Sequence, residues 1–103
     1  MNIGQLLQAV KVPHLSKEQV EEYFDSMNHL FADLSMEMGD LKKEEALFIF
    51  EQTHRADQKI TNASASNSWR VTEKGRRMIE VDASLRAVSK ELSGLKHKIF
   101  NSY

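Results

Sequence analysis

Apolar side chains recur through the second half of the sequence at a strict spacing of three and four residues. Helices use such a seam to pack along each other at a shallow angle. Thr72 is a suitable N-terminal cap, so the spacing predicts a helix over about 72–100. The seam spans three unbroken heptads and consists of Met78, Val81, Leu85, Val88, Leu92, Leu95 and Ile99.

A second seam with the same spacing runs through the first half of the chain. Ser16 and Gln19 are spaced as a capping box at its start, where each side chain can bond the backbone N–H of the other residue. We expect one helix over about 16–58, with or without a kink near Gly39. The alternative is two helices, with Asp40 capping the second. The apolar members are Val20, Phe24, Met27, Phe31, Leu34, Met38 and Leu41.

The rest of the chain supplies a short helix and a connection. Residues 3–10 have the pattern of a short amphipathic helix. The stretch TNASASNS is rich in side chains that compete for backbone hydrogen bonds, so we expect a polar loop over about 61–71. The fold predicted for residues 1–103 is therefore a single all-α domain, in which a short helix precedes a long antiparallel helical hairpin.

A lone hairpin has too little interior to bury the aromatic side chains of this sequence. Further apolar residues beside the seams widen the adhesive face: Leu30, Leu47, Ile49 and Ile79. We therefore expect hairpins to assemble into an oligomeric helical bundle through the seam residues. The alternative is a monomeric three-helix bundle, in which the first helix folds back over the hairpin.

Charge is divided between the two halves. Residues 1–52 carry ten acidic and four basic side chains, a formal charge of −6. Residues 53–103 carry five acidic and ten basic side chains, a formal charge of +5. Such an asymmetry indicates partners, either nucleic acid or further copies of the chain.

The densest group of positive charges follows the polar stretch. Lysine and arginine neutralise phosphates, and an indole can stack on an unpaired base, so the group is a candidate nucleic-acid or phosphate site. In the alternative interpretation, the tryptophan covers one end of the bundle and the arginines pair with acidic side chains of the first long helix. The candidate residues are Trp69, Arg70, Lys74, Arg76 and Arg77, joined across the loop by Arg55 and Lys59.

Other classes of function lack their signatures. The sequence has no cysteine, no glycine-rich phosphate loop and no nucleophile elbow, so we expect neither an enzyme nor a cofactor. Glu51 and His54 have the spacing of di-metal bundles, but the second Glu-x-x-His that such sites need is missing, so we expect no metal. Without a signal peptide or an apolar span, the chain is expected in the cytoplasm, the host cytoplasm if it is phage-encoded.

Two segments carry a resemblance to a known family. The segment LKKEEALFIFEQTHRADQK, a polar connection and the segment TEKGRRMIEVDASLRAVSKELSGLKHKI resemble small helical proteins of tailed phages, in particular the UvsY-like recombination mediators. The likeness covers about residues 30–100. It includes an acidic residue ahead of the heptad run, as Asp82 precedes Leu85 here. It implies an oligomer that binds single-stranded DNA and helps to load a recombinase.

Two hypotheses follow for function. In the first, the chain is an oligomeric, non-enzymatic and phage-encoded accessory protein that binds single-stranded nucleic acid through the basic group. In the second, it is a coiled-coil interaction module, an adaptor or an inhibitor of a host system, and its opposite charges set the pairing of its helices. In a variant of the first, the same arginines bind a small phosphate-bearing ligand, such as a nucleotide, in place of nucleic acid.

Overall fold

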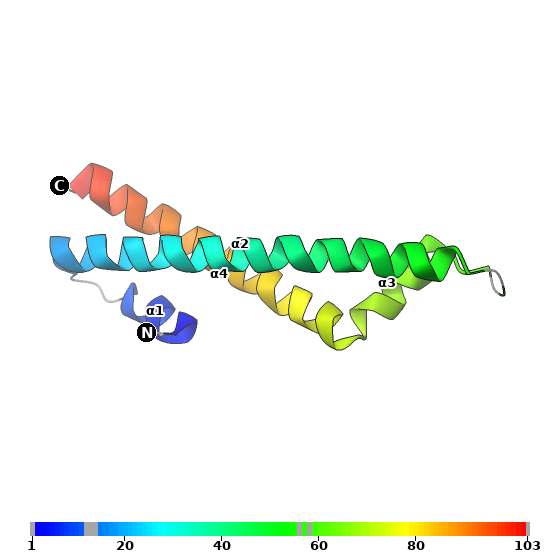
Figure 1. The fold of residues 1–103 in the computed structure, drawn as a ribbon. Coiled ribbons are helices and arrows are strands. Elements are labelled where there is room, and N and C mark those ends of the chain that lie inside the picture. The colour runs from blue at the N-terminus through cyan, green and yellow to red at the C-terminus, as the bar shows by residue number, and fades with distance from the viewer. Residues whose placement is uncertain (1, 12–14, 56, 58, 103) are drawn as a thin grey trace. The chain divides into compact units, whose positions relative to one another are not determined.

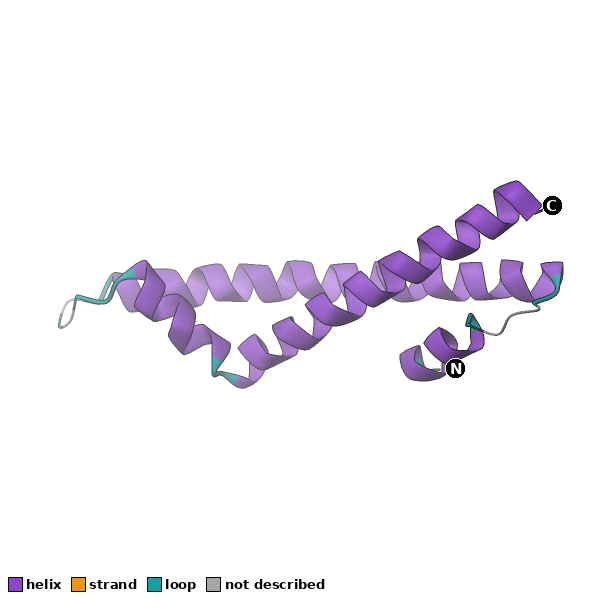
Figure 2. Ribbon diagram, turned by 180° about the vertical axis from the view of Figure 1, so that it is seen from behind, coloured by secondary structure: helices purple, strands orange, loops and turns teal. Residues whose placement is uncertain are grey.

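The computed structural model describes residues 2–11, 15–55, 57 and 59–102. Its regular elements are all helices, as Figure 2 shows, and the predicted all-α class is confirmed. In chain order they are α1 (Ile3–Ala9), α2 (Lys17–Thr53), α3 (Asn62–Arg70) and α4 (Glu73–Ser102), labelled in Figure 1.

Contacts divide the chain into two compact units. The terminal unit combines Met1–Ser35 with Ala83–Tyr103, and the central unit is Met36–Asp82. Both long helices contribute to both units, because α2 and α4 each cross a boundary. Within each unit a stretch of α2 packs against an antiparallel stretch of α4, as expected of a helical hairpin.

The terminal unit holds α1, the first part of α2 and the last part of α4. Helix α1 begins with a capping box, in which the Asn2 side chain accepts from the Gln5 N–H at 2.8 Å and the Gln5 side chain accepts from the Asn2 N–H at 3.0 Å. Buried apolar residues come from all three helices and from the end of α1: Leu6, Val10, Val20, Met27, Leu34, Val88 and Leu95.

The central unit holds the second part of α2, all of α3 and the first part of α4. Its buried apolar residues again come from every helix: Met38, Leu41, Ala65, Trp69 and Val81. The aromatic ring of Phe48 on α2 lies 5.6 Å from the ring of Trp69 on α3, measured between centroids. Helix α3 is therefore fixed to the hairpin by its own apolar side chains.

Helix α2 is continuous over 37 residues and passes through Gly39 without a break. The Ser16–Gln19 capping box is present, with bonds of 2.9 and 3.1 Å, so this prediction is confirmed. The alternative of two helices with a cap at Asp40 is wrong.

The predicted end of the first long helix near residue 58 is also wrong, because α2 ends at Thr53. Positions 56 and 58 lie outside the described residues. The Thr53 hydroxyl donates to the Ile49 carbonyl at 2.8 Å, and the His54 Nδ1 lies 2.9 Å from the Phe50 carbonyl. These side chains add contacts to carbonyls of the last turn, and the Phe50 carbonyl also accepts the His54 N–H at 3.0 Å.

The polar loop predicted over 61–71 is wrong, because most of it is helix α3. Thr61 caps this helix, its hydroxyl accepting from the Ser64 N–H at 3.1 Å. Ala65 and Trp69, four residues apart, are buried on one side of it. A nine-residue helix is marginal alone, so burial of these two side chains stabilises a segment whose composition favours turns.

The two predicted seams divide into buried and half-buried members. One position in each heptad is buried throughout: Val20, Met27, Leu34 and Leu41 on α2, and Val81, Val88 and Leu95 on α4. The other position is only half-buried at Phe24, Met78, Leu85, Leu92 and Ile99 and is exposed at Phe31, whereas Met38 is buried. One position of each seam thus supplies core residues of the chain, and the other position remains partly accessible to solvent.

Candidate functional site

The junction between α3 and α4 is the most closely packed backbone feature near the predicted basic group. The Trp69 carbonyl oxygen accepts the Thr72 N–H at 3.0 Å and the Thr72 hydroxyl at 2.6 Å. The Thr72 hydroxyl oxygen in turn accepts the Gly75 N–H at 3.0 Å, which confirms Thr72 as the cap of α4. A Cβ atom added to Gly75 would overlap the Trp69 carbonyl and lie 3.0 Å from the Arg70 Cα.

Trp69 is a core residue of the central unit. Only 4% of it is exposed, its ring packs against Phe48, and its indole N–H donates to the Met78 sulfur at 3.4 Å. Its ring is therefore turned towards the protein and not presented to solvent. A base could stack on it only after the central unit opened.

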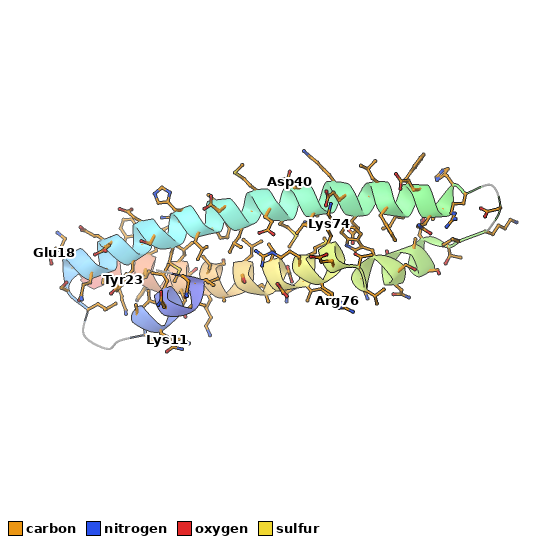
Figure 3. The ribbon with its side chains drawn as sticks, turned by 60° about the horizontal axis from the view of Figure 1, so that its bottom comes forward. Lys11, Glu18, Tyr23, Asp40, Lys74 and Arg76 are labelled. Atoms are coloured by element: carbon orange, nitrogen blue, oxygen red, sulfur yellow. The ribbon has the colours of Figure 1, made fainter. Side chains whose placement is uncertain are left out.

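Two members of the basic group form ion pairs with α2. Arg77 donates from Nε and a terminal nitrogen to the two carboxylate oxygens of Glu37, at 2.6 and 2.8 Å. Lys74 donates to Glu44 at 2.7 Å, and Arg77 also lies 3.4 Å from Glu80. The structure thus joins the basic start of α4 to acidic side chains of α2 within the central unit. Lys74 lies toward α2 in Figure 3, and Arg76 lies away from it.

The Arg77–Glu37 pair changes the protonation behaviour of both groups. The pKa of Glu37 lies below its ordinary value, chiefly because its carboxylate accepts hydrogen bonds from Arg77 and also because of the guanidinium charge, whereas burial acts in the opposite direction. The pKa of Arg77 is raised, chiefly by the same hydrogen bonds. Both side chains keep a third or more of their surface in water, with 47% of Arg77 and 36% of Glu37 exposed. Such a pair contributes less than about 1 kcal/mol.

Acid should therefore remove this contribution. Because the pKa of Glu37 is lower in the folded chain than in the unfolded one, the pair stabilises the fold above the ordinary value of 4.5 and is lost as pH falls through the lowered value. We expect Glu37→Gln to cost up to about 1 kcal/mol at neutral pH and progressively less as the pH falls below 4.5. Urea unfolding of parent and variant across this range measures the difference. Glu22→Gln is the control, since Glu22 is exposed and has no ion pair in the described part of the chain; an equal pH trend for both variants would contradict the assignment.

The remaining candidate cations are distributed over two places. Arg70 and Arg76 are exposed and form no ion pair within the described residues. Both belong to the α3–α4 junction, where Gly75, the neighbour of Arg76, lies against the backbone of Arg70. Arg55 lies beyond the end of α2, 3.7 Å from Asp57, and Lys59 precedes α3. Helix α3 is nine residues and thus about 13 Å long, and it separates Arg55 and Lys59 from the α3–α4 junction.

The depression beside the basic group has mixed charge. It encloses about 580 Å³ and is lined by two cations, Arg76 and Arg77, and two carboxylates, Glu73 and Glu80. Two carboxylates cancel much of the attraction that a phosphate would feel. This arrangement does not favour the small-nucleotide variant.

Pairing of the basic group with the acidic first long helix was the alternative interpretation of the sequence, and the structure shows it for Arg77 and Lys74. The sequence did not distinguish Glu37 and Glu44, the residues that form these pairs, from the other acidic residues of α2. Sequence reasoning missed the close packing at Gly75. The signal for Gly75 would have been a glycine in the first turn of a helix beside a tryptophan, which indicates a close backbone approach.

The described residues contain neither a cluster of metal ligands nor a membrane-spanning helix. Nowhere in this part of the chain do three or more His, Asp or Glu side chains gather closely enough to hold a metal ion, and His54 stacks on Phe50 with ring centroids 4.0 Å apart. Among these residues no helix combines the length and the apolar character needed to span a bilayer.

A scan against protein-family models found no matching family, and searches of curated proteins and of solved structures found no match either.

Proposed function

We propose that this protein is a non-enzymatic helical module that self-assembles and acts through protein–protein contacts. The observation that carries the proposal is the distribution of exposed apolar surface. Of the seven large hydrophobic side chains exposed in the described part of the chain, five belong to the central unit and are at least 58% exposed: Met36, Leu47, Phe50, Val71 and Ile79. Concentrated apolar exposure of this kind is typical of interaction surfaces.

The charges of the central unit support the same proposal. Acidic α2 and basic α4 neutralise each other through Arg77–Glu37 and Lys74–Glu44. Half of the densest basic group is thereby engaged within the chain, and Trp69 is in the core. The opposite charges of the two halves of the chain then stabilise the pairing of α2 with α4 more than they favour the binding of a polyanion.

Light scattering over a range of protein concentrations tests the proposal. We expect a mass that is a multiple of 11.8 kDa and that persists in high salt, because salt screens charges but does not weaken apolar burial. A Leu47→Ser/Phe50→Ser variant should assemble more weakly. The matched control Asn28→Ser/Ala32→Ser, at exposed positions of the terminal unit, should behave as the parent. A mass of 11.8 kDa at every concentration would contradict self-assembly.

Single-stranded DNA binding is the second candidate, as the resemblance to recombination mediators implies. The observation in its favour is the pair of exposed arginines, Arg70 and Arg76, at the α3–α4 junction. Adding a single-stranded oligonucleotide to the same light-scattering series detects it. Binding through this pair would weaken with salt, and Arg70→Ala/Arg76→Ala would flatten the slope of log affinity against log salt by about 1.4. An unchanged slope would remove these residues from the site.

A further inference from the structure

Helix α2 carries a second row of side chains on its solvent side within the central unit. The row repeats the four-three spacing of a helix seam and consists of Met36, Asp40, Lys43, Leu47 and Phe50, here called the outer row. Its apolar members are far more exposed than core residues, at 72% for Met36, 62% for Leu47 and 58% for Phe50. Asp40 and Lys43 are also exposed, and neither forms an ion pair in the described part of the chain.

The outer row is distinct from the seam that packs inside the chain. Met38 and Leu41 of the inner seam are 8% and 6% exposed. In Figure 3, Asp40 lies on the edge of α2 that faces away from α4. Helix α2 thus has one apolar stripe that packs inside its own chain and another that the described residues leave exposed.

The first four residues of the outer row are complementary to themselves when their order is reversed, and Phe50 lies beyond this set. The point midway between Leu41 and Lys42 is also midway between Asp40 and Lys43 and midway between Met36 and Leu47. A second α2 turned end for end about this point places Lys43 of the second copy opposite Asp40, and Leu47 of the second copy opposite Met36. A two-fold axis repeats both pairs, as an isologous dimer requires.

We propose that two copies of this chain pair through the outer rows of their α2 helices, antiparallel and in this register. The inference rests on the proposed function and names the surface that performs it. Two unlike-charge contacts form at the centre, flanked by two apolar contacts. A parallel, in-register pair would instead place Asp40 against Asp40 and Lys43 against Lys43, and such like-charge contacts are unfavourable.

The neighbours of the outer row fit a close helix–helix contact. Gly39 and Ala46 are exposed on one flank, one heptad apart. A Cβ atom at Gly39 would meet nothing within 4 Å among the described residues, so none of these residues requires a glycine there. Glycine costs about 1 kcal/mol relative to alanine inside a helix. In the proposed dimer, the missing side chain at Gly39 allows the backbone of a second helix to approach closely.

The acidity of α2 opposes the pairing of two such helices. The ion pairs that Glu37 and Glu44 form with α4 reduce this repulsion before the copies meet. Folding of the central unit therefore prepares α2 for association.

Disulfide trapping tests the register, and the chain is suited to it because it contains no cysteine. Residues 36 and 47 are eleven positions apart on one helix, about 16 Å, well beyond the roughly 7 Å limit between bridged Cα atoms. A Met36→Cys/Leu47→Cys variant can therefore cross-link these positions only between copies. We expect a covalent dimer on mild oxidation of the double variant. Neither single variant should form one, since like positions also lie about 16 Å apart in the antiparallel pair.

Each outcome has one interpretation. Efficient cross-linking of both single variants would show parallel pairing and overturn the register. Absence of cross-linking in the double variant, while light scattering still shows an oligomer, would overturn this surface and leave the proposed function standing. A monomer by light scattering would overturn both.

Charge reversal provides an independent measurement. Asp40→Lys should raise the dissociation constant about tenfold, because it places lysines opposite each other. Asp40→Lys/Lys43→Asp should restore the parent value, since it exchanges the two signs and keeps them complementary. Equal association of the single variant and the parent would overturn the central contact.

Discussion

Replacing Trp69 with alanine is expected to lower the free energy of unfolding by about 4 kcal/mol, the usual cost of truncating a buried tryptophan. The indole fills the space between α2, α3 and the start of α4, where it contacts Phe48 and Met78. Since domains of this size have only about 5–15 kcal/mol in total, the loss is a large fraction of the stability. Urea unfolding followed by circular dichroism measures it.

The control for this change is its neighbour Ser68, which is exposed. Ser68→Ala should shift the unfolding free energy by less than about 0.5 kcal/mol. Trp69→Phe should fall between parent and alanine variant, since a smaller ring keeps part of the packing but loses the bond to the Met78 sulfur. If Trp69→Ala were as stable as the parent and lost only oligonucleotide binding, the ring would belong to a binding surface and not to the core.

Replacing Gly75 with alanine is expected to cost about 3 kcal/mol, as overpacking of a closely fitted site does. The new Cβ would overlap the Trp69 carbonyl, a backbone atom that cannot turn aside as a flexible side chain can. The α3–α4 junction would have to open and weaken the two hydrogen bonds from Thr72 to that carbonyl. Thermal and urea unfolding both report the change.

Gly94 supplies the matched control, because it is a helical glycine of α4 with nothing within 4 Å of an added Cβ. Gly94→Ala should stabilise the fold by up to about 1 kcal/mol through helix propensity. Opposite signs for the same chemical change at two glycines of one helix would isolate the effect of the junction. A gain at both positions would mean that the junction is looser than described.

The long helices were predictable from sequence because heptad spacing and capping are local properties. The Ser16–Gln19 box needs only residues within one turn, and the seams need only a regular period. The unbroken course of α2 through Gly39 was favoured for the same reason, since the glycine did not shift the phase of the apolar residues. Heptad spacing and capping boxes can be recognised without knowing which element of the fold packs against the helix.

Helix α3 could not be predicted from the same signals, because its stability depends on tertiary burial. Serine and asparagine dominate the segment and favour turns, whereas Ala65 and Trp69 find a core only after α2 and α4 are in place. The role of Trp69 was ambiguous for the same reason. An indole beside arginines suits a base-stacking site or a bundle end, and only its packing against Phe48 separates them.

The outer row was missed because a search for apolar seams passes over charged members. Asp40 and Lys43 interrupt the apolar run between Met36 and Leu47 without disturbing its spacing. Their exposure and their freedom from ion pairs inside the described chain are structural facts that composition does not contain. The antiparallel complementarity of this row could be recognised only once the structure showed that its residues share the exposed side of α2.

The sharing of α2 and α4 between two compact units makes the folding of each unit depend on the other. No loop separates Ser35 from Met36 or Asp82 from Ala83, so the boundary falls inside both helices. If the central unit opened, its part of α2 would lose its tertiary partners, and helices in proteins owe most of their stability to such packing. Fraying would then spread along both backbones into the terminal unit. The two units should therefore behave as one cooperative species, in which a lesion at the α3–α4 junction reduces amide protection near both ends of the chain.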